Sequence, residues 1–153
     1  MEFNYRQMNH KDVKDVARMC YDFYLESSIN GLVPWDHAYI CENLHALVDN
    51  ADFFGMVAMD KKHVAGFITA IKTPSTFYRG YMASEQVFWV DPPYRKTSMM
   101  PLRLIRSFKQ WAKDTDCKVF TMGADAQNWE ELEGPYRLVG LKSGDMTYWG
   151  KVF

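Results

Sequence analysis

A short polar segment, Arg95-Lys96-Thr97-Ser98, has the clearest chemical potential in this sequence. It follows an apolar run with a proline turn, and an amphipathic helix is predicted to begin just after it, near Pro101. The first turn of a helix exposes unpaired N–H groups, and the helix dipole adds partial positive charge there. Two cationic side chains lie at the same place. The segment therefore predicts a binding site for a phosphorylated cofactor.

The elements that must position this segment follow a mixed pattern. Apolar alternation and short apolar runs predict strands at 3–7, 53–58, 64–70, 87–90, 119–122 and 146–152. Apolar residues at helical spacing predict helices over 10–26, 35–48, 101–113 and 129–132. This order predicts a mixed α/β fold of the α+β kind, in which a central, mostly antiparallel sheet has helices on both faces. One right-handed strand–helix–strand crossover lies in the middle.

Composition narrows the class of protein. The 153 residues are 48% hydrophobic and 24% charged, and no repeat or linker divides them, so residues 1–153 are expected to form one domain. A net charge of −1 offers no basic field for nucleic acid, and no apolar run reaches the ~20 residues that span a bilayer. Three cysteines without a Cys-x-x-Cys pair favour reduced thiols, and the start lacks the layout of a secretory leader. A cytoplasmic protein without membrane or nucleic-acid partners is expected.

The element order and the local residues together resemble the GNAT superfamily of N-acetyltransferases, over nearly the whole chain. In that family the fourth strand ends in an apolar run and a turn with proline, as Phe88-Trp89-Val90-Asp91-Pro92 does here. The family's pyrophosphate loop reads Arg or Gln, two free positions, Gly, one free position, then Gly or Ala. Here Arg95 matches, whereas Ser98 and Met100 replace the two glycines. A glycine lets backbone approach phosphate without an intervening Cβ, so these departures bear on binding.

The resemblance implies a GNAT-like acyl-CoA N-acyltransferase fold and acetyl-CoA (coenzyme A) as cofactor. The residues that it assigns to cofactor binding are Phe88, Trp89, Val90, Arg95, Lys96, Thr97, Ser98, Met99, Met100, Arg103 and Asn128. Arg103 is assigned to the adenosine 3′-phosphate, with a solvated helix face as the alternative. Asn128 lies near the place where family members have a cofactor-contacting asparagine.

Two residues are candidates for catalysis. The run from Tyr136 to Leu141 keeps the family spacing of Tyr, three residues and Gly, with Leu in place of Phe. By the resemblance, Tyr136 protonates the departing thiolate of coenzyme A; packing against the sheet is the alternative. Glu85 matches the region where many GNAT enzymes hold a general base, although an exposed strand glutamate fits equally well.

Three potential metal ligands, His37, Cys41 and His45, are spaced i, i+4, i+8. They span about 12 Å of a helix, so one ion cannot bind all three, and no metal site is expected. In the GNAT fold the first two helices flank the acceptor groove, so His37 or Trp35 could contact substrate.

The activity implied is direct transfer of an acetyl group from acetyl-CoA to a primary amine of a small molecule or protein. Two alternatives stay open: a catalytically impaired binding or regulatory protein on a GNAT scaffold, and a GNAT-like enzyme that modifies nucleobases. A homodimer is plausible for the superfamily. Short, divergent GNAT chains also resemble bacteriophage proteins, and a virus-encoded chain would act in the host cytoplasm.

Overall fold

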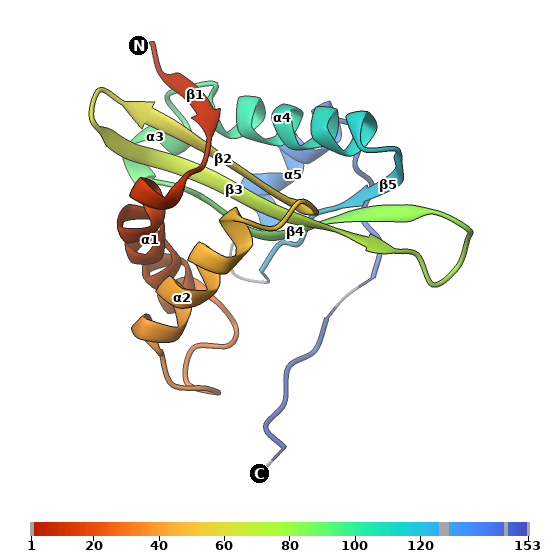
Figure 1. Ribbon diagram of the computed structural model, residues 1–153, viewed down its shortest axis with the longest axis horizontal. Coiled ribbons are helices and arrows are strands. Elements are labelled where there is room, and N and C mark those ends of the chain that lie inside the picture. The colour runs from red at the N-terminus through yellow and green to blue at the C-terminus, as the bar shows by residue number, and fades with distance from the viewer. Residues whose placement is uncertain (1, 126–128, 146, 153) are drawn as a thin grey trace.

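A five-stranded mixed sheet forms the centre of the computed structural model, which describes residues 2–125, 129–145 and 147–152 (Figure 1). The strands, in spatial order, are β1 (Asn4–Gln7), β2 (Phe53–Asp60), β3 (His63–Pro74), β4 (Tyr81–Val90) and β5 (Cys117–Thr121). The pairs β1–β2, β2–β3 and β3–β4 are antiparallel, and β4–β5 is parallel. The predicted fold class, a mostly antiparallel sheet with one parallel crossover, is confirmed.

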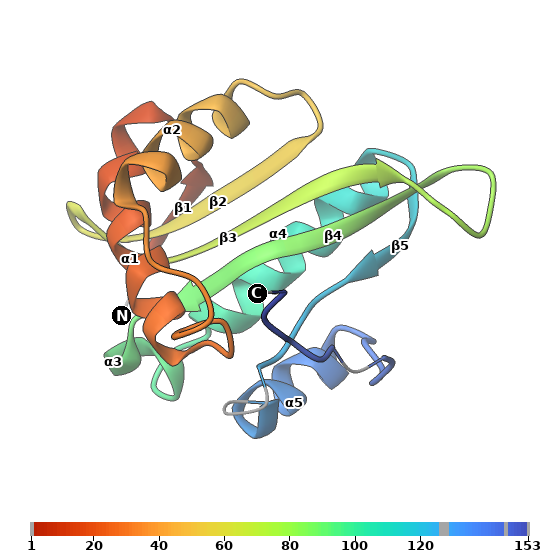
Figure 2. The ribbon, with the colours of Figure 1, turned by 90° about the horizontal axis from the view of Figure 1, so that it is seen from below.

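Helices cover both faces of the sheet (Figure 2). They are η1 (His10–Asp12, a 3₁₀ turn), α1 (Val13–Glu26), α2 (His37–Val48), α3 (Pro92–Arg95), α4 (Met100–Asp114) and α5 (Trp129–Leu138). Helices α1 and α2 lie on one face, α4 lies on the other, and α5 packs beside α4 (Figures 1 and 2). The connection from β4 to the parallel strand β5 contains α3 and α4.

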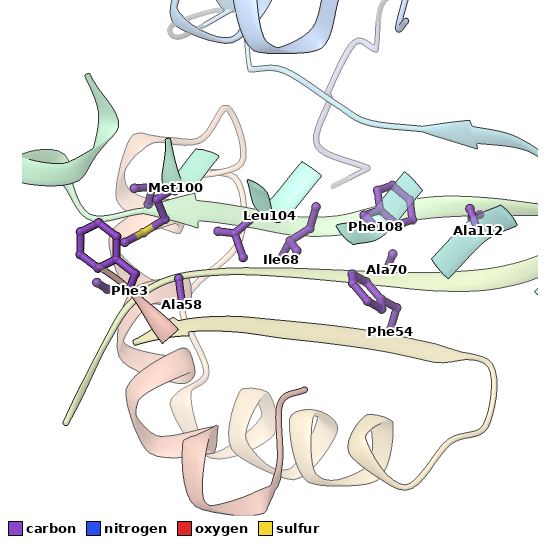
Figure 3. Close-up of a cluster of buried hydrophobic side chains, with 12 residues drawn as sticks. Phe3, Phe54, Ala58, Ile68, Ala70, Met100, Leu104, Phe108 and Ala112 are labelled. Carbon is purple, nitrogen blue, oxygen red and sulfur yellow. The ribbon is translucent and has the colours of Figure 1, made fainter. Parts of the chain in front are cut away.

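The core has one layer on each side of the sheet. On the α4 side, the stripe of Met100, Leu104, Phe108 and Ala112 packs against strand residues such as Ile68 (Figure 3). On the other side, α1 packs against strand residues that include Val57, Phe67 and Trp89. Neighbouring residues of β3 alternate between these layers, because successive side chains of a strand point to opposite faces. Both faces of the central strand are therefore buried.

Strand β4 contains a β-bulge at Gln86. Thr69 pairs with Val87, and Ala70 pairs with Glu85, so Gln86 is the additional residue. The hydroxyl of buried Thr69 accepts a hydrogen bond from the Val87 N–H at 3.2 Å. Pairing of β4 with β5 covers only residues 81–84 of β4, and β5 then diverges from it (Figure 2). The bulge lies where the two parallel strands separate.

Several predicted elements differ from the structure. Strand β4 begins at Tyr81 rather than near Val87, and Arg95 ends the short helix α3 instead of lying in a loop. Helix α5 continues through Pro135 to Leu138, because Tyr136 and Val139 pack against the α4 layer. The strand predicted at 146–152 was wrong for the described residues, since 147–152 form no regular element and their large apolar side chains are exposed.

Candidate functional site

A pocket of about 110 Å³ lies where the end of β4, the α3–α4 segment, α5 and α1 meet. Its lining residues are Phe23, Phe88, Trp89, Val90, Arg95, Lys96, Pro101, Glu131, Leu132 and Pro135. Five of the residues assigned to cofactor binding from sequence are among them: Phe88, Trp89, Val90, Arg95 and Lys96. The end of β4 and the cationic residues Arg95 and Lys96 therefore line the same pocket.

Arg95 is held rigidly at this pocket. Its Nε donates to the carbonyl of Val90 at 2.7 Å, and its guanidinium carbon lies 4.3 Å from the ring centroid of Trp89. Nη2 lies 3.7 Å from a carboxylate oxygen of Glu26. A planar guanidinium fixed through Nε and stacked on an indole presents its terminal N–H groups to an anionic group, which in this structure is the Glu26 carboxylate. Arg95, which matches the first position of the family's pyrophosphate loop, is thus a hydrogen-bond donor with a fixed position.

The segment that follows is ordered by its own hydroxyl groups. Thr97 Oγ1 donates to the Pro93 carbonyl and Ser98 Oγ donates to the Tyr94 carbonyl, each at 2.7 Å. Ser98 Oγ also accepts from the N–H of Met100 at 3.3 Å. Within the described part of the chain, the backbone N–H groups of residues 97–99 have no hydrogen-bond acceptor. Three backbone donors next to two cations form a suitable cradle for phosphate oxygens.

Met100, at the second glycine position of the family loop, does not obstruct this cradle. Its side chain is fully buried in the core between α4 and the sheet (Figure 3). The side chain of its neighbour Met99 is exposed. A Cβ added to Gly66 of β3 would lie 2.8 Å from the Met100 sulfur, so Gly66 provides the space that Met100 fills. The Met100 side chain therefore points into the core and away from the loop.

The two candidate catalytic residues both bind Gly123, two residues after the end of β5. Oε2 of Glu85 accepts a hydrogen bond from the Gly123 N–H at 2.9 Å, and the Tyr136 hydroxyl donates to the Gly123 carbonyl at 2.5 Å. Sequence reasoning assigned no role to Gly123; the only signal was its position at the end of a predicted strand. The contact lies where β4 and β5 separate, and Tyr136 follows the lining residue Pro135.

Both groups of this pair have raised pKa values. Burial raises the pKa of Glu85 from its usual 4.5 to about 7, although the hydrogen bond from Gly123 lowers it. Burial, followed by the nearby charge of Glu85, raises the pKa of the Tyr136 hydroxyl. Glu85 can therefore exchange a proton near neutral pH, while Tyr136 keeps its proton there.

Two residues assigned to cofactor binding, Arg103 and Asn128, are not placed at the pocket by the described structure. The guanidinium carbon of Arg103 lies 5.4 Å from the ring centroid of Tyr5 on β1, and Arg103 is not a lining residue of the pocket. Asn128 lies outside the described residues. The roles assigned to both stay predictions.

The possible metal ligands do not converge. His37 Nε2 lies 3.6 Å from the sulfur of Cys41. His45, in the last turn of α2, instead has its Nδ1 2.8 Å from Nδ1 of His10 in η1. Among residues 2–125, 129–145 and 147–152, no group of three or more His, Cys, Asp or Glu side chains could hold a metal ion. None of the helices in this described part is both long and apolar enough to cross a membrane.

Known structures share this fold. No protein-family model and no curated protein matches the chain. Among solved structures, a transcriptional regulator from Bacillus halodurans C-125 has a TM-score of 0.80 at 14% identity, covering 97% of this chain and 99% of that one. A GNAT family acetyltransferase from Staphylococcus aureus has a TM-score of 0.71 at 16% identity, covering 99% and 100%.

The aminoglycoside N-acetyltransferase AAC(6')-Iy, solved in complex with CoA, has a TM-score of 0.77 at 13% identity, covering 98% of this chain and 94% of that one. At these identities the similarity establishes the fold. The chain has the fold of GNAT acyl-CoA N-acyltransferases, as the sequence resemblance implied.

Proposed function

We propose that this protein is an acetyl-CoA-dependent N-acetyltransferase that transfers an acetyl group directly to a primary amine of a small molecule or a protein. The observation that carries the proposal is the joint attachment of Glu85 and Tyr136 to Gly123, where β4 and β5 separate. A carboxyl group that titrates near neutral pH thus lies beside a phenol that stays protonated. Amine acetylation needs this combination of base and acid.

The residues present fit the diphosphate of coenzyme A. Arg95 and Lys96 supply two positive charges, and the N–H groups of residues 97–99 supply directed donors. The buried side chain of Met100 leaves the approach to those donors open. When bound, acetyl-CoA supplies an activated thioester as the acyl donor. The backbone of Phe88 and Val90, on the strand that has parted from β5, is the proposed contact for its pantetheine arm.

The chain's own residues account for the proton movements. Glu85 accepts a proton from the amine, directly or through water, and its ionised form is available at and above about pH 7. Tyr136 donates its hydroxyl proton to the departing sulfur. Because the charge of Glu85 raises the pKa of Tyr136, protonation of Glu85 makes Tyr136 the better acid. Return of the proton from Glu85 to the Tyr136 phenolate through solvent restores both groups.

A second candidate is a regulatory protein that retains the scaffold without catalysis. It is favoured by the replacement of both family glycines with Ser98 and Met100, and by the ion pairs that already occupy Arg95 and Lys96. One structure of the same fold is described as a transcriptional regulator.

Calorimetry and a transfer assay test these proposals. Titration with acetyl-CoA should show saturable binding at one site per chain. A panel of polyamines, aminoglycosides and peptides with free amino termini should then release free coenzyme A thiol in the presence of at least one amine. Absence of binding at millimolar acetyl-CoA would overturn the enzyme proposal, whereas binding without transfer to any amine would favour the second candidate. The Glu85→Gln variant, which should still bind cofactor, is the control for thiol release.

A further inference from the structure

Two carboxylates from different elements contact the two cations of the proposed phosphate cradle. Oε1 of Glu131, in the first turn of α5, lies 3.5 Å from Nζ of Lys96. Oε2 of Glu26, at the end of α1, lies 3.7 Å from Nη2 of Arg95. Carboxylate oxygens are the same kind of acceptor as phosphoryl oxygens, so each carboxylate takes the place of an anionic ligand.

The two pairs differ in how easily they can separate. Arg95 is fixed by its bond to the Val90 carbonyl and its stacking on Trp89, and its side chain is only 25% exposed. The Lys96 side chain is 80% exposed and that of Glu131 is 47% exposed. A lysine on a flexible stem exchanges partners without disturbing its surroundings. The Lys96–Glu131 pair is therefore the one that a ligand can displace most readily.

Glu131 also lines the pocket itself, together with Arg95 and Lys96. Any diphosphate bound by Lys96 would lie close to the Glu131 carboxylate, and like charges at short range repel. Glu131 therefore opposes an anionic ligand twice, once by pairing with Lys96 and once by its own charge.

We propose that Glu131 is an intramolecular competitor of the cofactor diphosphate and thereby sets the affinity of the site. This inference rests on the proposed function, because it concerns the same cradle. In the absence of cofactor, Glu131 neutralises Lys96; binding exchanges that carboxylate for a phosphate group. Removing the charge of Glu131 should tighten cofactor binding, in contrast to most substitutions in a binding pocket.

Glu130 offers a matched control. It precedes Glu131 in the same first turn of α5, carries the same charge and has the same favourable position relative to the helix dipole. Among the described residues it forms no ion pair and does not line the pocket. The Glu130→Gln and Glu131→Gln variants therefore differ in the contact with Lys96 and in little else.

The test is calorimetric titration of wild type, Glu131→Gln, Glu130→Gln, Lys96→Ala and Glu131→Gln/Lys96→Ala with acetyl-CoA at low salt. We expect Glu131→Gln to lower the Kd by about two- to fivefold, the range for an exposed ion pair, and Glu130→Gln to change it less. The gain from Glu131→Gln should be smaller in the Lys96→Ala background, because only the direct repulsion by Glu131 then remains. It should also shrink near 1 M salt, where the Debye length is about 3 Å.

The possible failures are separable. Equal Kd values for wild type and Glu131→Gln would overturn this inference and leave the proposed cofactor site standing. An equal gain in Glu130→Gln would also overturn it, because general charge would then explain the effect. No binding by any variant would overturn both proposals. If only Glu131→Gln bound acetyl-CoA, both proposals would be supported. Glu131 would then weaken cofactor binding by more than the expected two- to fivefold.

Discussion

Glu85 and Tyr136 bind the two backbone polar atoms of a single residue, Gly123: Glu85 accepts from its N–H at 2.9 Å, and Tyr136 donates to its carbonyl at 2.5 Å. Glu85 lies on β4, 38 residues before Gly123, and Tyr136 lies on α5, 13 residues after it. One backbone unit therefore positions both groups, and the charge on one raises the pKa of the other. In the proposed reaction the base acts first and thereby prepares the acid.

Replacing Glu85 by Gln should remove the base without removing the hydrogen-bond acceptor for Gly123. Wild-type kcat/KM should rise with pH through about 7 as Glu85 ionises. In the variant, kcat/KM should no longer rise with pH in this range. Its rate should be lower by about 10²- to 10⁴-fold, the usual contribution of a general base. Rates measured from pH 5 to 9 with saturating acetyl-CoA, with the Kd from calorimetry as control, test this. A variant whose kcat/KM still rose with pH in this range would show that another group is the base.

The same carboxyl should make stability depend on pH. Since its pKa is raised from 4.5 to about 7, the native protein holds a proton that the unfolded chain releases in this window. The free energy of unfolding should therefore fall as pH rises from 4.5 to about 7, by at most about 1.4 kcal/mol per pH unit. Above that window this contribution is constant. Urea denaturation of wild type and Glu85→Gln at several pH values should show the variant gaining relative stability as pH rises; parallel curves would contradict it.

Replacing Tyr136 by Phe should separate catalysis from cofactor binding. Loss of the acid should lower kcat by about 10²-fold or more, while the Kd for acetyl-CoA changes little. Loss of the bond to the Gly123 carbonyl should lower the free energy of unfolding by about 0.5–1.5 kcal/mol. Tyr148→Phe, at an exposed position, is the matched control and should leave both quantities unchanged. Full activity in Tyr136→Phe would assign Tyr136 to packing alone.

Adjacent methionines at the start of α4 should respond very differently to truncation. Met100 is fully buried against Gly66, whereas Met99 is 58% exposed. Met100→Ala should lower the free energy of unfolding by about 2–5 kcal/mol, because it leaves a cavity in the core. Met99→Ala should stay within about 0.5 kcal/mol of wild type. Thermal and urea unfolding measure both, and a Met100→Ala variant as stable as wild type would mean that this side chain does not fill the core.

The sequence could predict whatever depends on neighbours along the chain. Apolar spacing predicted a segment of each of the five strands and most helices, and the order of elements predicted the crossover with the cationic segment before α4. Arg95 and Tyr136 were predicted as site residues from motifs that span six residues each. The helix after Trp129 was predicted too short, because Gly134 and Pro135 are helix breakers in sequence while packing of Tyr136 sustains the helix in the structure.

Only the tertiary structure decided how these parts meet. The bulge at Gln86 exists because β3 and β4 pair in a particular register, which no local pattern encodes. Tertiary packing also turned Met100 into the space left by Gly66 and brought Glu131 to Lys96. The strand predicted at 146–152 has the right residue types, yet β-strands form only with a paired neighbour, and no described strand pairs with residues 147–152. The periodicity of apolar residues indicates which face of each segment is buried. The geometry of the candidate site depends instead on contacts between segments that are distant in sequence.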